Sequence, residues 1–130
     1  MSSYTRSENA VKNAVINLLR LHGIWAMRIN TGAFSAEHRG KRRFVRFALP
    51  GTADIMATPQ PWVRYAVGKI EMEVQHPAVL WIETKRPGRK GAQSPAQLAF
   101  EKDVVSRGHY YLLVDDPAQV LRWLQEHAAI

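Results

Sequence analysis

The sequence contains no cysteine, so disulfide bonds and metal sites built on thiolates are excluded. Any metal must then be bound by carboxylate, carbonyl or imidazole groups. The sequence also lacks an apolar run long enough to cross a bilayer, and residues 1–8 lack the apolar core of a signal peptide. It has no glycine-rich phosphate loop and no serine motif typical of a hydrolase triad. We therefore expect a soluble, cytoplasmic protein with no membrane partner and no organic cofactor.

Positively charged residues are in clear excess. Lys and Arg total 18 against 11 Asp and Glu, which gives a net charge of +7 and a pI near 10.1. Such a balance favours a polyanionic partner, because each neutralised phosphate releases condensed counterions. A basic surface that is merely solvated would have the same charge, so charge alone separates the two explanations weakly. The length of 130 residues and the apolar fraction of 46% fit one compact domain over residues 1–130.

Three segments have the apolar spacing of amphipathic helices, namely residues 8–22, 94–107 and 116–127. A capping box is predicted at the start of the first helix from Thr5 and Glu8, and at the start of the second from Ser94 and Gln97. In the third helix, the side chains predicted to face the core are Val120, Leu121 and Leu124. Strands are predicted at residues 24–29, 43–47, 54–57, 79–84 and 109–114, with a loop over residues 30–40. This order predicts one mixed α/β domain.

Residues 59–77 are bracketed by prolines and contain two further apolar runs, one on each side of Gly68. In the second run, apolar and polar residues alternate in the order Ile70, Glu71, Met72, Glu73, Val74 and Gln75. Such alternation is typical of a strand with one solvated face. The segment is therefore predicted to form a β-hairpin that is solvated on one side.

Two acidic residues stand at the ends of apolar segments. Glu83 and Lys85 follow a buried run and point the same way, because side chains alternate along a strand. Asp54 follows a turn and starts another strand, from which it can face Glu83. Two converging carboxylates repel each other unless a cation lies between them, and hard oxygen ligands suit Mg²⁺ or Mn²⁺. Taken alone, Glu83 and Lys85 fit a strand-end salt bridge, and Asp54 fits a turn cap.

Five elements occur in a characteristic order. They are a first helix with Glu8, the turn Gly51-Thr52-Ala53-Asp54, the strand end Glu83-Thr84-Lys85, the helix start Ser94-Pro95-Ala96-Gln97 and the strand from Gly108 to Val114. Together they resemble the PD-(D/E)xK nuclease superfamily and, more narrowly, its virus-type replication-repair nuclease (VRR-NUC) domain. The resemblance spans roughly residues 7–124. The chain departs from the family at Ala53, where Pro is usual, and in the hairpin at 59–77, which would be an insertion.

The resemblance implies a restriction-endonuclease-like α/β fold, with a mixed sheet flanked by helices. It also implies a DNA endonuclease that uses Mg²⁺, with Mn²⁺ as a substitute, to hydrolyse phosphodiester bonds. Branched DNA is the implied substrate, as for Holliday-junction resolvases, in a setting such as DNA repair, a phage or a mobile element. A homodimer is implied as well, since cutting two strands symmetrically needs two sites.

Individual roles also follow from the resemblance. Asp54 and Glu83 would bind the metal together with the carbonyl oxygen of Thr84, and Lys85 would stabilise charge at the phosphate. Glu8 and Gln97 would complete the catalytic site. For these last two residues an alternative stays open, because each also fits the third position of a capping box.

Half of the cationic residues fall in two short stretches, which are predicted to contact the DNA backbone. The first stretch contains Arg39, Lys41, Arg42, Arg43 and Arg46, and the second contains Lys85, Arg86, Arg89 and Lys90. A solvated loop is the alternative explanation for each stretch.

Two other functions remain open. The first is a non-catalytic nucleic-acid-binding module on the same fold, and the second is a structural subunit of a larger complex. Asp54, Glu83 and Lys85 argue against the binding module, because a pure binder has no need of converging acidic groups in a basic groove. A structural subunit would have no measurable DNA affinity alone.

Overall fold

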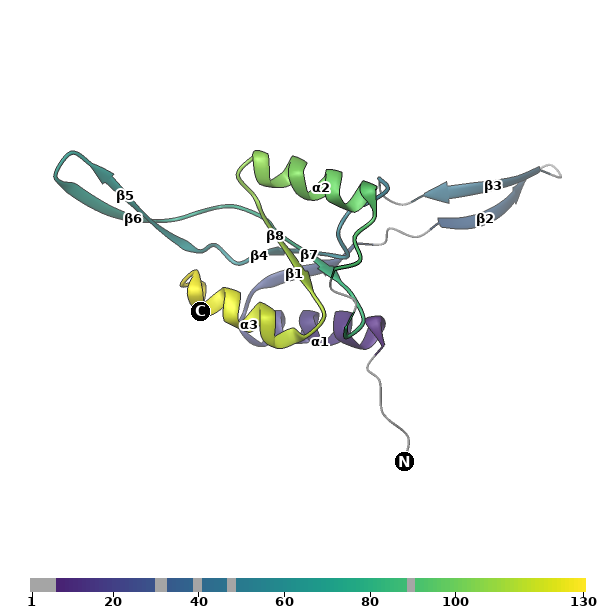
Figure 1. The fold of residues 1–130 in the computed structure, drawn as a ribbon, viewed down its shortest axis with the longest axis horizontal. Coiled ribbons are helices and arrows are strands. Elements are labelled where there is room, and N and C mark those ends of the chain that lie inside the picture. Colours follow the sequence, from purple (N-terminus) through teal and green to yellow (C-terminus); the bar gives the residue numbers. More distant parts are fainter. Residues whose placement is uncertain (1–6, 30–32, 39–40, 47–48, 89–90) are drawn as a thin grey trace, which may run out of the picture.

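A mixed four-stranded sheet with helices on both faces forms the centre of the chain (Figure 1). A computed structural model describes residues 7–29, 33–38, 41–46, 49–88 and 91–130, with the backbone alone at 33–38 and 41–46. The helices are α1 (Glu8–Leu21), α2 (Pro95–Ser106) and α3 (Pro117–Glu126). The strands are β1 (Trp25–Arg28), β2 (Ala33–His38), β3 (Lys41–Arg46), β4 (Ile55–Thr58), β5 (Trp62–Val67), β6 (Ile70–Gln75), β7 (Leu80–Thr84) and β8 (Tyr110–Val114). The predicted mixed α/β class is confirmed.

The central sheet has the strand order β1-β4-β7-β8. β1, β4 and β7 are antiparallel neighbours, whereas β7 and β8 are parallel. A parallel pair needs a crossover connection, and α2 provides it between β7 and β8. This arrangement places the start of β4 and the end of β7 side by side, with Ile55 paired to Ile82.

One face of the sheet packs against α1 and α3, and the other packs against α2 (Figure 1). The apolar stripe of α1 fills the first interface, where Val11, Val15 and Leu19 are fully buried. Burying one such side chain contributes about 1.5–3 kcal/mol. On the second face, the rings of Trp81 and Phe100 contact each other edge to face, with their centroids 5.1 Å apart. Among the described residues, no helix is long and apolar enough to cross a membrane.

Several predicted details are wrong. The first helix is capped by Ser7, whose hydroxyl accepts from Ala10 N–H, so Glu8 is the first helical residue and not the third of a capping box. Thr5, the predicted cap, lies outside the described residues. On α3, Trp123 is buried and Leu121 is only half-buried, because Trp123 shares the inner face with Val120 and Leu124 while Leu121 lies at the border of that face.

The segment predicted as a loop at 30–40 contains β2, which pairs with β3 in a separate two-stranded ribbon. The strand predicted at 43–47 is present as β3, which begins two residues earlier, at Lys41, and is described as far as Arg46. The two strands form a hairpin that extends from the sheet on the side opposite β5 and β6 (Figure 1). Their pairing satisfies backbone groups that a loop would leave to water.

The predicted hairpin at 59–77 is confirmed as β5 and β6, joined at Gly68, which has a φ of +62°. Both of its faces are exposed, however, where the alternation predicted only one solvated face. Alternation shows which side chains share a face, but it cannot show whether another element covers that face.

Candidate metal centre

A tight turn that packs against the start of α2 places Asp54 directly before β4, an inner strand of the sheet. Gly51 has a φ of +85°, and a Cβ at this position would collide with the Ala96 carbonyl. Only glycine therefore allows the turn to approach the helix so closely. The Thr52 hydroxyl closes the turn by donating to the Leu49 carbonyl at 2.7 Å. The chain then enters β4 with Asp54 facing the neighbouring strand.

Asp54 is buried and its orientation is fixed by Thr84. Both the backbone N–H and the hydroxyl of Thr84 donate to Oδ2 of Asp54, each at 2.9 Å. The second oxygen, Oδ1, lies 3.4 Å from the ammonium group of Lys12 on α1. These partners offset the cost of burying a carboxylate.

Glu83 is buried and only partly satisfied. Its Oε1 accepts from the amide of Gln97 at 3.0 Å and lies 3.8 Å from the Lys85 ammonium group. Its Oε2 is buried without a hydrogen-bond partner among the described residues. Burial, and after it the charge of Asp54, raise the pKa of Glu83 from 4.5 to about 8, against the opposing charge of Lys85 and with a smaller contribution from a hydrogen bond between the two carboxyl groups. A buried carboxylate oxygen without a donor has the character of an open ligand position.

The carboxylate of Glu8 completes a cluster with Asp54 and Glu83. One oxygen from each residue lies within 4.8 Å of the other two, although Glu8 itself is exposed. Two ligands of one cation lie at most twice the metal–oxygen distance apart, which is about 4.2 Å for Mg²⁺ and about 5 Å for Ca²⁺. The three oxygens are therefore close enough for one hard cation to draw them together by small movements of the side chains.

Gln97 both caps α2 and contacts the acidic cluster. Its carbonyl oxygen accepts from the Ser94 N–H at 2.9 Å, and Ser94 Oγ accepts from the Gln97 N–H, so the predicted capping box is present. The same oxygen accepts from Lys85 Nζ at 3.1 Å, and the amide nitrogen donates to Glu83. The helix cap thus carries its polar side chain into the acidic cluster.

The cluster contains three carboxylates and two nearby ammonium groups. With every group ionised, one negative charge is unbalanced among Glu8, Asp54, Glu83, Lys12 and Lys85. The raised pKa of Glu83 allows the metal-free site to balance that charge by holding a proton. A bound divalent cation would take the place of the proton and would leave the cluster with a net charge of +1.

The structure brings together five of the predicted site residues, namely Glu8, Asp54, Glu83, Lys85 and Gln97. Thr84 is beside them, but the contacts described are those of its N–H and hydroxyl with Asp54, so the predicted role of its carbonyl stays a prediction.

Among the predicted DNA contacts, Arg86 is exposed at the end of β7, and Lys41, Arg42, Arg43 and Arg46 lie on β3. Arg39, Arg89 and Lys90 lie outside the described residues.

Lys12 is a site residue that the sequence did not single out. It stands four residues after Glu8, which is the spacing that places two side chains on one face of a helix. Its side chain is only 14% exposed, because neighbouring positions on α1 are part of the core. Arg28 was also missed. Its guanidinium donates to the Asn9 side chain at 2.8 Å, which places a cation beside the first turn of α1.

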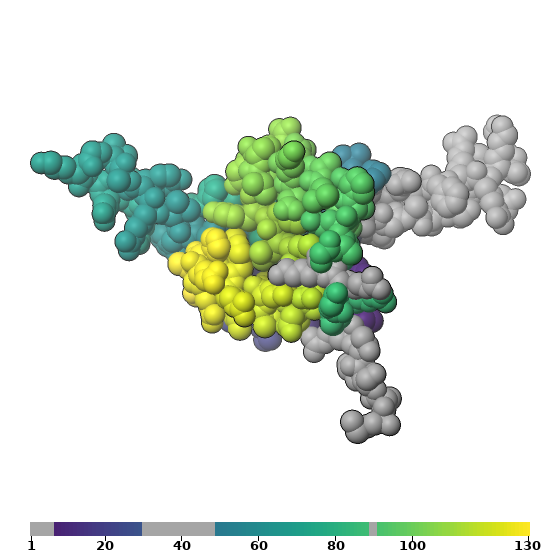
Figure 2. All heavy atoms as spheres, viewed as in Figure 1, coloured from purple at the N-terminus to yellow at the C-terminus, as the bar shows by residue number. Residues whose placement is uncertain are grey.

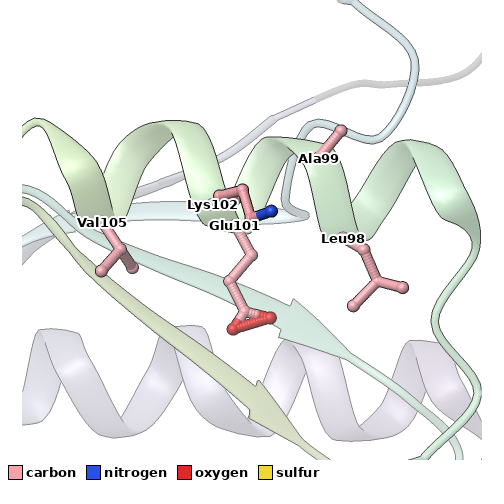
Figure 3. A pocket seen from close by; sticks show the side chains of 5 residues that line it. All are labelled: Leu98, Ala99, Glu101, Lys102 and Val105. Atoms are coloured by element: carbon pink, nitrogen blue, oxygen red, sulfur yellow. The ribbon is translucent and has the colours of Figure 1, made fainter.

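A hollow lies against α2, and none of the residues that line it belongs to this cluster (Figure 3). It is lined by Leu98, Ala99, Glu101, Lys102 and Val105. Leu98 and Val105 are seven residues apart and lie on one side of the helix. The hollow contains a single acidic residue, so it offers no comparable set of metal ligands.

No protein-family model, curated protein or solved structure matches this chain. The resemblance to VRR-NUC nucleases therefore rests on the motifs themselves and on their order.

Proposed function

We propose that this chain is a metal-dependent nuclease that hydrolyses phosphodiester bonds in DNA. The observation that supports this best is the buried Oε2 of Glu83, which has no hydrogen-bond partner among the described residues, in a carboxylate that clusters with those of Asp54 and Glu8. Oxygen ligands of this kind suit Mg²⁺ or Mn²⁺. A restriction-endonuclease-like arrangement of the sheet and membership of the VRR-NUC family are parts of the same proposal.

Asp54, Glu83 and Glu8 would hold the cation, which supplies charge that stabilises the phosphate oxygens during hydrolysis. Thr84 keeps Asp54 in position through its two hydrogen bonds. Gln97 holds Lys85 and Glu83 at a fixed separation. Lys85 carries a positive charge that can stabilise the negative charge of a phosphate next to Glu83.

The position of the β2–β3 ribbon supports DNA as the substrate. In the sequence, the ribbon lies between Ile29 and the turn that carries Asp54. The backbone N–H of Ile29 donates to the Asp54 carbonyl at 2.7 Å, so the last residue described before the ribbon lies beside Asp54. Its second strand, β3, contains Lys41, Arg42, Arg43 and Arg46. Cations in this position would hold the phosphate backbone beside the site without reading sequence.

A cleavage assay on the purified chain tests the function. The substrates are a four-way junction, a flap, a linear duplex and single-stranded DNA, each with Mg²⁺, Mn²⁺ or EDTA. We expect metal-dependent cleavage that Glu83→Gln lowers by at least about 10²-fold, with DNA binding retained. Glu126→Gln, an exposed carboxylate on α3, is the matched control and should cleave normally.

Cleavage that survives EDTA, or that Glu83→Gln leaves unchanged, would refute the proposal. Salt-sensitive binding without cleavage of any substrate would instead support a binding module. The substrate that is cut fastest would test the expected preference for branched DNA.

A further inference from the structure

The β5–β6 hairpin, defined by residues 62–75, projects from the body of the molecule as a separate arm (Figures 1 and 2). Its register pairs Val63 with Val74, Tyr65 with Met72 and Val67 with Ile70. Because side chains alternate along each strand, these six share one face of the arm. The other face carries Trp62, Arg64, Ala66, Glu71, Glu73 and Gln75. One face of the arm is therefore entirely apolar.

This apolar face is open to solvent. Val67 and Ile70 are 67% and 65% exposed, Tyr65 and Met72 are about half exposed, and Val74 is 41% exposed. An isolated two-stranded hairpin is marginally stable in water, and it needs a third strand or a packing partner for stability. No other described element packs against the hairpin. The partner that covers this face is therefore expected to be another molecule.

The area of the face matches that of a protein interface. Side chains exposed to this extent present on the order of 500 Å² of apolar surface, near the upper end of the largest patch on a typical monomer. Two such faces in contact would remove on the order of 1,000 Å² from water, which is about the area that a specific interface needs.

The charges on the arm favour a second copy of the chain as the occupant. The arm carries Arg64 and Lys69 against Glu71 and Glu73, so it is neutral, whereas the whole chain has a net charge of +7. Arg64 and Glu73 form an ion pair at 3.0 Å on the polar face, away from the apolar one. Two copies can therefore meet at this arm without the repulsion that other contacts between two basic chains would produce.

We propose that the apolar face of β5–β6 is a dimerisation surface, covered by the same face of a second copy of this chain. Each face would contribute three cross-strand apolar pairs, and a two-fold axis would place identical faces against each other. Neither nucleic acid nor an acidic membrane surface is favoured as the occupant, because the face carries no cation. Dimerisation through this face does not require the proposed nuclease activity.

Sedimentation of the full chain between about 1 and 100 μM, with paired variants, tests this interface. The first variant, Tyr65→Ser with Met72→Ser, changes one cross-strand pair on the apolar face. The second, Arg64→Ser with Glu73→Ser, changes the adjacent pair on the polar face and serves as the matched control. We expect a wild-type dimer whose Kd rises at least about tenfold in the first variant and changes less than about threefold in the second. A wild-type chain that stays monomeric throughout, or equal effects of the two variants, would overturn the proposal.

Thiol labelling distinguishes a loss of dimerisation from a loss of folding. Because the chain has no cysteine, Met72→Cys and Glu71→Cys each introduce a unique thiol, on opposite faces of β6. We expect maleimide labelling of Met72→Cys to slow as protein concentration rises through the dimerisation range, while that of Glu71→Cys stays constant. A labelling rate of Met72→Cys that does not depend on concentration would overturn the proposal. So would a monomer whose Met72→Cys thiol is protected only by lipid vesicles, which would assign the face to a membrane.

Discussion

The side-chain amide of Gln97 donates a hydrogen bond of 3.0 Å to Oε1 of Glu83. The same side chain closes the capping box of α2 with Ser94 and accepts from Lys85. Because one residue performs both tasks, the start of the helix and the acidic cluster share a structural element. α3 carries an equivalent box, formed by Asp116 and Gln119, and the described residues form no acidic cluster of this kind beside it.

Replacing Gln97 by Ala should therefore affect activity as well as stability. Gln97→Ala and Gln119→Ala should each lower the free energy of unfolding by about 1 kcal/mol or less, because each loses half of a capping box. Only Gln97→Ala should lower DNA cleavage, by about tenfold, because it also frees Lys85 and Glu83. Denaturant unfolding and the cleavage assay measure the two effects. Equal cleavage by the two variants would show that Gln97 only caps the helix.

The stability of the metal-free protein should depend on the protonation of Glu83. Its folded pKa is raised from 4.5 to about 8, so the folded protein keeps a proton that the unfolded chain has released. This contribution to stability is complete below pH 4.5 and is lost as the pH rises through about 8. Glu83→Gln carries no such proton, so its stability relative to wild type should increase between pH 5 and pH 9.

Thermal unfolding in EDTA across this pH range measures that difference. Added Mg²⁺ should raise the Tm of wild type at the alkaline end and leave the Tm of Glu83→Gln nearly unchanged, because binding to the folded state alone stabilises it. Curves that stay parallel from pH 5 to pH 9 would contradict the assignment of the raised pKa to Glu83.

Lys12 should oppose metal binding while it stabilises the metal-free protein. Its ammonium group lies 3.4 Å from Oδ1 of Asp54, and both side chains are largely buried. Lys12→Met would leave that oxygen without a counter-charge, at a cost of about 1–3 kcal/mol. The variant should bind Mg²⁺ more tightly than wild type, since no ammonium group competes with the cation.

The rise in Tm with added Mg²⁺ measures this affinity. Lys102→Met, at an exposed position on α2, is the control. It should match wild type both in the stability of the metal-free protein and in the affinity for Mg²⁺. Weaker Mg²⁺ binding by Lys12→Met would indicate instead that Lys12 helps to assemble the metal ligands.

Gly23 and Gly51 both have a positive φ, but only Gly51 makes a close contact. Comparing them separates the energetic cost of that contact from the cost of the backbone conformation. Gly23→Ala places a methyl group in open space at a φ of +71°, so it should cost about 1 kcal/mol. Gly51→Ala adds a collision with the Ala96 carbonyl, and should cost about 3 kcal/mol or more. Denaturant unfolding compares the two variants, and equal costs would show that the turn can move away from α2 freely.

Local sequence patterns predicted most of the central fold. The helical spacing of Val11, Val15 and Leu19 placed α1, and the apolar run before Glu83 placed β7. The pairing of Asp54 with Glu83 was also anticipated, because both flank buried strands. These features depend on periodicity and on turn residues close in sequence, which a single chain displays directly.

Features that depend on distant partners were not predictable in the same way. Residues 33–38 contain two alanines and a serine, which have weak strand preference, so they form β2 only through pairing with β3. Lys12 belongs to the site because α1 packs beside the turn that carries Asp54, and this is a tertiary contact. The exposure of both hairpin faces likewise depends on what the rest of the chain leaves uncovered.

The two hydrogen bonds from Thr84 have a consequence for the choice of cation. Both donate to Oδ2 of Asp54, so this oxygen is saturated and only Oδ1 remains to coordinate a metal. In the proposed site, Asp54 would therefore ligate a cation through one oxygen only. Ca²⁺ often takes a carboxylate through both oxygens, whereas Mg²⁺ requires single oxygens in near-octahedral positions. The two donors of one buried threonine would thus favour the smaller ion.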